Sequence, residues 1–196
     1  MTDRAPTREQ AAGTAPASTT ERATPAPPPG PRDAGTVDAG TVDAASFRAA
    51  MARFPAGVVV ATTLDEHGLP RGFTASSFCS VSLTPPLVLV CLADSAESYG
   101  AFTRCARFAV SVLGPEHSAL ATRFATRSAD KFADRGLTLT AARLPAVEGA
   151  RSVLDCTVHE RYPAGDHVII VGRVTGARLG EGEPMVYFDR AFRSLA

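Results

Sequence analysis

The sequence predicts a β-dominated α+β fold, in which antiparallel strands close into a barrel and a few helices are inserted between them. Short runs of β-branched and apolar residues, bounded by glycine, proline and polar turn residues, recur from Gly57 to Phe188. A doubly wound sheet is not indicated, because strands and helices do not alternate throughout and no G-x-G-x-x-G follows the first strand. Closing the strands into a barrel would remove the exposed edges that a long antiparallel sheet otherwise leaves.

The chain of 196 residues is predicted to divide into a tail, 1–46, and a folded domain, 47–196. The tail contains no Leu, Ile, Phe, Tyr or Trp, is rich in proline, and repeats the sequence Ala-Gly-Thr-Val-Asp at 34–38 and 39–43. Such a segment cannot bury enough apolar surface to offset the entropy of ordering. It also lacks the continuous apolar stretch of a secretory signal. We therefore expect a disordered linker.

A short amphipathic helix is predicted at the start of the domain. After a possible cap at Ser46, apolar side chains recur at helical spacing until Pro55, at Phe47, Ala50, Met51 and Phe54.

An antiparallel meander is predicted to follow. Residues 57–64 are apolar and β-branched, 65–68 carry turn chemistry, and a second strand pattern runs to Pro85-Pro86 before the apolar run 87–92. Thr74, Ser76 and Ser77 interrupt this block with small hydroxyl side chains, which leave room for a phosphate or a ring carbonyl to approach the backbone. The alternative is a strand rim whose hydroxyls meet only water.

The remaining elements are predicted from periodicity and turn residues. Helices are expected at 95–105, at 115–126 with proline at the first position, and as a short turn at 128–132. Strands are expected at 107–113, 153–162, 167–178 and 185–188, with a turn at 163–166.

Composition excludes several classes of function. Twenty basic and 20 acidic residues give no net charge, so no electrostatic footprint for nucleic acid or an anionic membrane is present. No apolar run approaches the roughly 20 residues that span a bilayer, which predicts a soluble, cytoplasmic protein. The cysteines are widely spaced in apolar stretches, which predicts buried free thiols and no zinc site, at Cys79, Cys91, Cys105 and Cys156.

Four motifs, taken in order, resemble the flavin reductase family with an FMN-binding split barrel. They are Phe54-Pro55-x-Gly57-Val58, the segment 72–78 (GFTASSF), the segment 80–86 (SVSLTPP) and Gly165-Asp166-His167. The resemblance covers residues 47–192 and implies an antiparallel split β-barrel. Members of this family are typically the reductase component of two-component flavin-dependent monooxygenases.

The resemblance also implies site residues. The stretch Thr74, Ala75, Ser76 and Ser77 is expected to lie along the flavin, although the family also uses asparagine at the position of Ser76. His167 is expected beside the flavin, where it contacts nicotinamide or flavin and is oriented by Asp166. The local alternative is an ordinary hairpin turn.

Three further residues are carried over on weaker matches. Ser98 is expected to contact the flavin, with Asp94 or Ser95 as helix caps in the alternative interpretation. Lys131 is expected to contact phosphate, and Phe132 to lie over the flavin or in the core.

The function implied is an NAD(P)H:flavin oxidoreductase that reduces FMN or FAD with NADH or NADPH and supplies reduced flavin to a partner monooxygenase. A homodimer is expected by resemblance. One alternative is a flavin-binding electron carrier or non-catalytic module on the same barrel. Another is an oxidase of the pyridoxamine phosphate type, which the lack of an Arg and Lys cluster for a second phosphate disfavours.

Overall fold

The computed structural model describes residues 41–133 and 136–195, so nearly all of the predicted disordered tail lies outside the described residues. In chain order the elements are α1 (Ala44–Met51), β1 (Ala56–Gly57), β2 (Val59–Leu64), β3 (Pro70–Ala75), β4 (Cys79–Ser82), β5 (Leu87–Ala93), α2 (Tyr99–Arg104), β6 (Arg107–Val112), η1 (Pro115–His117), α3 (Ser118–Ala125), β7 (Leu137–Leu139), β8 (Pro145–Val147), β9 (Ser152–Ala164), β10 (His167–Leu179), β11 (Val186–Phe188) and β12 (Ala191–Arg193).

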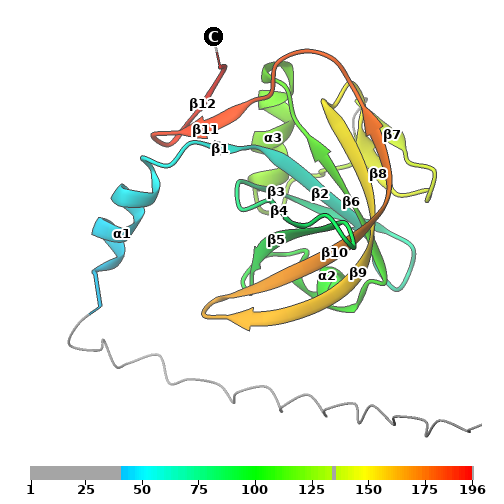
Figure 1. Cartoon of the computed structure of the whole chain (residues 1–196), viewed down its shortest axis with the longest axis horizontal. Helices are drawn as coiled ribbons and strands as arrows, with labels where there is room; N and C mark the ends of the chain where they lie inside the picture. Colours follow the sequence, from blue (N-terminus) through cyan, green and yellow to red (C-terminus); the bar gives the residue numbers. More distant parts are fainter. Residues whose placement is uncertain (1–40, 134–135, 196) are drawn as a thin grey trace, which may run out of the picture. The chain divides into compact units, whose positions relative to one another are not determined.

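Seven strands form one antiparallel sheet in the order β3-β2-β6-β9-β10-β5-β4 (Figure 1). Three hairpins build it, β2–β3, β4–β5 and the long β9–β10 pair. The sheet curls so that β3 approaches β5, but the described strands do not pair there. The barrel is therefore split along this seam, which confirms the predicted antiparallel split barrel.

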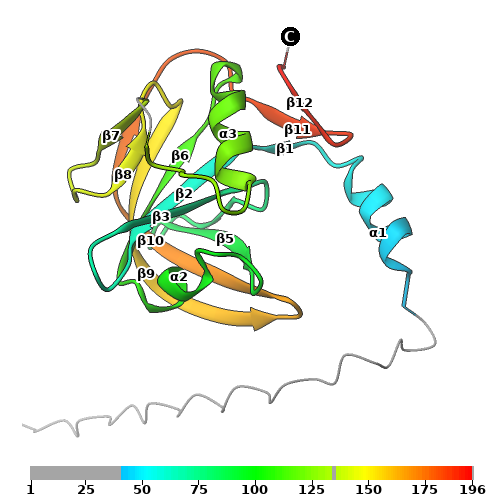
Figure 2. The ribbon, with the colours of Figure 1, turned by 180° about the vertical axis from the view of Figure 1, so that it is seen from behind.

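Both faces of the sheet carry buried apolar residues. Along β2, Val59 and Ala61 join an inner apolar cluster with Phe73, whereas Val60 joins an outer cluster with Phe124 of α3. This alternation follows from the two-residue period of a strand. Phe102 of α2 packs edge-on against Phe73 in the inner cluster, with the ring centroids 4.9 Å apart. Helix α3 and the β7–β8 hairpin cover the outer face (Figure 2).

The β7–β8 hairpin was not predicted, because each of its strands has three residues and too short a pattern to recognise. Buried hydroxyls attach it to the barrel. Thr62 donates a hydrogen bond to the carbonyl of Pro145, and Ser111 accepts one from the amide of Val147 at 3.0 Å. The strands that were predicted are present, but the run 57–64 is divided into β1 and β2, and the second strand pattern is divided into β3 and β4; the chain also adds β12 after β11.

Helix predictions were less accurate than strand predictions. The α1 helix is capped by Asp43, which accepts from the amides of Ala45 and Ser46, so Ser46 is not the cap. The α2 helix begins at Tyr99 and not at residue 95. Residues 128–132 form turns in place of the predicted helical turn, and Ser128 has a φ of 57°.

The cysteine prediction was only partly right. All four thiols are free, but Cys79 is exposed, Cys91 and Cys105 are half-buried, and Cys156 alone is buried. Burial raises the pKa of Cys156 to about 12. Within the described ranges, no helix is both long and apolar enough to cross a membrane.

Candidate functional site

A cavity of about 420 Å³ lies at the open seam of the barrel. Its walls come from the end of β3, the end of β5, the turn before α2 and the end of α3. The volume falls in the range of roughly 300–1,000 Å³ that is typical of small-molecule sites. Seven of the eight predicted site residues line it: Thr74, Ala75, Ser76, Ser77, Ser98, Lys131 and His167.

Two of the predicted hydroxyls hold the cavity wall together. Thr74 donates a hydrogen bond of 2.7 Å from Oγ1 to the carbonyl of Ala121, which ties β3 to α3. Ser77 Oγ accepts from the amide of Cys91 at 3.1 Å and lies 3.2 Å from the carbonyl of the same residue. This hydroxyl therefore bonds to the backbone of β5 next to the start of β4, where no β4 residue pairs with Cys91. Ser76, between them, is exposed and lines the cavity.

Ser98 has the most informative hydroxyl in the cavity wall. The residue is 3% exposed, and its Oγ makes no hydrogen bond within the described part of the chain. It stands at the N-cap of α2 but makes no side-chain cap bond, and the caps expected in the alternative interpretation, Asp94 and Ser95, lie before the start of this helix at Tyr99. A buried hydroxyl without a partner is costly and calls for an explanation such as a bound ligand.

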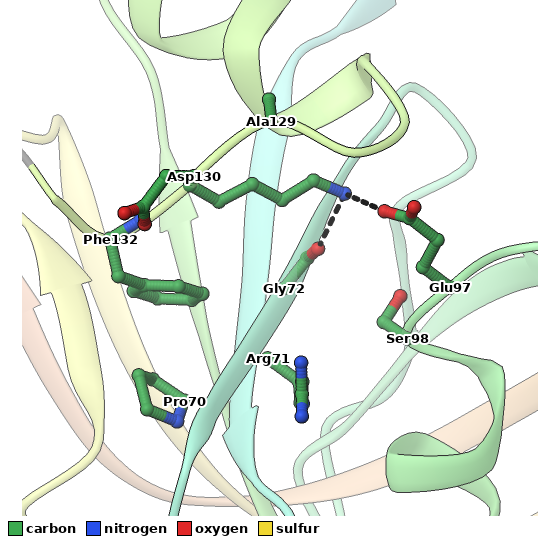
Figure 3. A pocket seen from close by; sticks show the side chains of 9 residues that line it. Pro70, Arg71, Gly72, Glu97, Ser98, Ala129, Asp130 and Phe132 are labelled. Atoms are coloured by element: carbon green, nitrogen blue, oxygen red, sulfur yellow. Dashed lines mark hydrogen bonds and ion pairs between the residues drawn. The ribbon is translucent and has the colours of Figure 1, made fainter.

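A smaller cavity of about 210 Å³ adjoins the first and shares Glu97, Ser98 and Lys131 with it (Figure 3). Lys131 Nζ contacts the carbonyl of Gly72 at 3.4 Å and Glu97 Oε2 at 3.7 Å, the two dashed lines of Figure 3. Its side chain is only 13% exposed. The ammonium group therefore lies where the two cavities meet.

Phe132 lines the smaller cavity and not the larger one. Its ring packs edge-on against Phe124, with the centroids 5.1 Å apart. Phe124 is fully buried and also lines the larger cavity. Phe132 therefore shares the smaller cavity with Ser98 and Lys131, but Phe124 takes its place in the wall of the larger one.

Glu97 and Arg127 also line the larger cavity, although sequence reasoning did not select them. Arg127 donates to the carbonyl of Ser95, and Glu97 Oε1 accepts from the amide of Ser128 at 2.8 Å. The hydrogen bond from the Ser128 amide is the main cause that holds the pKa of Glu97 below its usual value. The contacts join segments about 30 residues apart, so no local pattern could have revealed them.

His167 lies on the wall formed by the start of β10, opposite Ala93 of β5. Its Nδ1 donates to Asp166 Oδ1 at 2.7 Å, because a carboxylate can only accept. This bond is the first cause of the lowered pKa of Asp166. Asp166 also serves the turn, since its carbonyl accepts from the amide of Asp94. Both interpretations of the Gly165-Asp166-His167 motif therefore have a structural basis.

A third cavity, of about 310 Å³, is also lined by the Thr74–Ser76 segment. It is mainly apolar and includes Tyr187 and Phe192 of the C-terminal hairpin, whose ring centroids are 5.7 Å apart. The Thr74–Ser76 segment thus lines two cavities, and the third cavity is the more apolar of the two.

Comparison with known proteins points to one family. Residues 51–196 match the family model described as flavin reductase like domain. The actinorhodin polyketide dimerase of Streptomyces coelicolor is 55% identical over 149 residues, covering 76% of this chain and 84% of that protein. The reductase component of 4-hydroxyphenylacetate 3-monooxygenase from Thermus thermophilus is 41% identical over 150 residues, covering 76% and 94%. Some other relatives are longer, and this chain spans 41% of their length.

A solved structure agrees with this assignment. The NADH:FAD oxidoreductase SgcE6 of Streptomyces globisporus C-1027, in complex with NAD and FAD fragments, superposes with a TM-score of 0.74. The two chains are 38% identical, and the match covers 79% of this chain and 93% of the other.

Proposed function

This chain belongs to the flavin reductase-like domain family, and on that premise we propose that it is an NAD(P)H:flavin oxidoreductase that supplies reduced FMN or FAD to a partner monooxygenase. The observation that carries the proposal is the cavity at the barrel seam, where Ser98 keeps a buried hydroxyl that has no partner among the described residues. Relatives named as reductase components support the same function.

The residues of the cavity fit a flavin. A flavin presents ring carbonyl and nitrogen atoms that accept hydrogen bonds, and an anionic phosphate when it is FMN or FAD. Ser76 and Ser98 offer hydroxyl groups, while Arg127 and Lys131 offer positive charge. When bound, the flavin supplies the two-electron acceptor for a hydride from the nicotinamide. The protein needs only to orient the two rings and exclude water.

We assign His167 to contact the reacting rings. Asp166 fixes the imidazole through Nδ1, which leaves Nε2 as the nitrogen that can meet a ligand. The side chain is 43% exposed, so it can reach a second molecule that stacks on the flavin. Thr74 and Ser77 act indirectly in this assignment, because their hydroxyls fix the backbone of the segment that the flavin would lie along.

Replacement of His167 by alanine is expected to slow flavin reduction about tenfold, as expected for a polar contact that strengthens in the transition state. The measurement is the rate of anaerobic flavin bleaching after rapid mixing with NADH or NADPH. Asp166→Asn is the matched variant, because it keeps the turn but loses the carboxylate that orients the imidazole. Unchanged reduction rates in His167→Ala would remove this residue from the site.

The proposed function is tested with purified protein, NADH or NADPH, and excess FMN or FAD without oxygen. Multiple turnovers, with flavin lost on gel filtration, would support a reductase that releases its product. Bound flavin without reduction would favour an electron carrier or binding module instead. Bleaching that needs no polyketide would also separate this function from the one named for the Streptomyces coelicolor relative.

We propose that the protein is a cytoplasmic homodimer. The apolar residues in and just after α1 support the dimer. Phe47, Met51 and Phe54 follow helical spacing, yet they are 53%, 52% and 68% exposed. A second copy of the chain is the occupant we propose for this apolar face. The four free thiols fit a reducing compartment.

The variant Phe47→Glu/Met51→Glu is expected to convert the dimer into a monomer, because it places two charges on the proposed contact. Light scattering after gel filtration gives the mass directly. Exposed Leu139, on the β7–β8 hairpin, provides the matched control as Leu139→Glu. A wild-type monomer, or a variant that remains dimeric, would contradict this role of α1.

A further inference from the structure

We propose that Glu97 is a specificity residue that lowers the affinity of the site for the phosphate of a flavin. It does so by pairing with Lys131 and by placing a negative charge next to the bound phosphate. The inference rests on the proposed function, because it takes a phosphorylated flavin as the ligand. It concerns how tightly that ligand is held, and therefore how readily it is released.

Of the cationic side chains described in these cavities, Lys131 can most easily leave its present contacts and bind a phosphate. Among the residues that the structure describes, three cationic side chains line the two joined cavities: Arg71, Arg127 and Lys131. Arg71 binds Asp65 at 2.9 Å, and Arg127 donates to the carbonyl of Ser95. Lys131 makes longer contacts, at 3.4 Å and 3.7 Å, which lie at or beyond the limit of a hydrogen bond. If Lys131 gives up these contacts to bind a phosphate oxygen, it therefore loses little interaction energy.

The position of Lys131 also suits an anion. Its Nζ lies in the wall shared by the two cavities, and so does the Ser98 hydroxyl, which has no partner in the described part of the chain. An ammonium group and a hydroxyl donor together form a suitable pair for phosphate oxygens. Figure 3 shows Ser98 next to Glu97, on the same side of the cavity.

Glu97 is less free to move away than Lys131. Its Oε1 accepts from the amide of Ser128 at 2.8 Å and lies 3.4 Å from the Ser128 hydroxyl. These bonds hold the turn in which Ser128 has a positive φ of 57°. A phosphate that binds Lys131 would therefore share it with a fixed carboxylate of the same charge sign. Such repulsion lowers affinity for the phosphate without affecting a neutral flavin.

A lower affinity for the phosphate suits a protein whose product, reduced flavin, is used by a second enzyme. A reductase that passes reduced flavin to a second enzyme must release it, and a built-in anion beside the phosphate lowers the barrier to release. Riboflavin lacks the phosphate, so the ratio of the riboflavin Kd to the FMN Kd reports this effect separately from ring binding.

The decisive variant is Glu97→Gln, which removes the charge but keeps an amide oxygen that can accept from Ser128. We expect the ratio of the riboflavin Kd to the FMN Kd to rise about fivefold, measured by titration of flavin fluorescence. Glu66→Gln is the matched control, because Glu66 is an exposed partner of Arg104 outside both cavities, and it should leave the ratio unchanged.

Lys131→Met provides an independent test that does not depend on the folding of the Glu97 variant. It should lower the ratio of the two Kd values, because the phosphate then meets the Glu97 carboxylate without the ammonium group, and adding Glu97→Gln should raise the ratio again because the direct repulsion is removed. A ratio that stays at the wild-type value in either folded single variant, or that falls in Glu97→Gln, would overturn the inference. If the wild-type protein does not bind FMN, the proposed function fails as well. If the protein binds and reduces FMN but the ratio of the two Kd values does not change in Glu97→Gln, only the role of Glu97 is refuted and the proposed function stands.

Discussion

Valine in place of Gly172 is expected to lower the free energy of unfolding by about 3 kcal/mol and the Tm by roughly 6–12 °C. A Cβ built on Gly172 would lie 2.4 Å from Phe108 Cζ and 3.1 Å from Cys156 Cβ. Phe108 is fully buried and packs against Phe102, so its ring could move aside only by disturbing the core. Gly172 also lies at a shift in the β9–β10 register, which a larger residue would disturb.

Thermal unfolding followed by circular dichroism measures this effect, and Gly57→Val is its control. A Cβ at Gly57 would meet no atom within 4 Å, and this residue is exposed in β1. The same substitution there should change the Tm little. If Gly172→Val were as stable as Gly57→Val, the close packing of Phe108 against β10 would be contradicted.

Alanine in place of Ser98 is expected to act with opposite signs on the ligand-free protein and on flavin binding. Without ligand, the change removes a buried hydroxyl that has no partner in the described chain, so stability should rise by about 1 kcal/mol or more. With ligand, the same hydroxyl is the proposed donor to the flavin. Its loss should weaken binding by about 1–3 kcal/mol, which is roughly 5–150-fold in Kd.

The two effects are separated by measuring the Tm without ligand and the Kd of FMN for the same variant. Ser95→Ala is the matched control, because Ser95 lines the same cavity but is exposed, and its carbonyl group binds Arg127. A lower Tm in ligand-free Ser98→Ala would show that the hydroxyl has a partner within the protein. An unchanged Kd would show that it does not touch the flavin.

Much of the fold could be predicted because its signals are local. Strand β5 buries alternate residues, Val88, Val90 and Leu92, as its apolar sequence indicates. The β9–β10 hairpin turns at Gly165, whose φ of 64° suits glycine. Helices were less accurately predicted, since a distant carboxylate decides the conformation at Ser128.

The sequence by itself determined the barrel class and the segment Thr74–Ser77 as a candidate site, because period-two patterning and short motifs are properties of neighbouring residues. The tertiary structure decided which hydroxyls support the wall and which stays without a partner. It also decided that Glu97 meets Lys131, 34 positions later in the chain. Such contacts depend on how the loop after α3 folds against the turn before α2, and packing between distant segments leaves no periodic trace in the sequence.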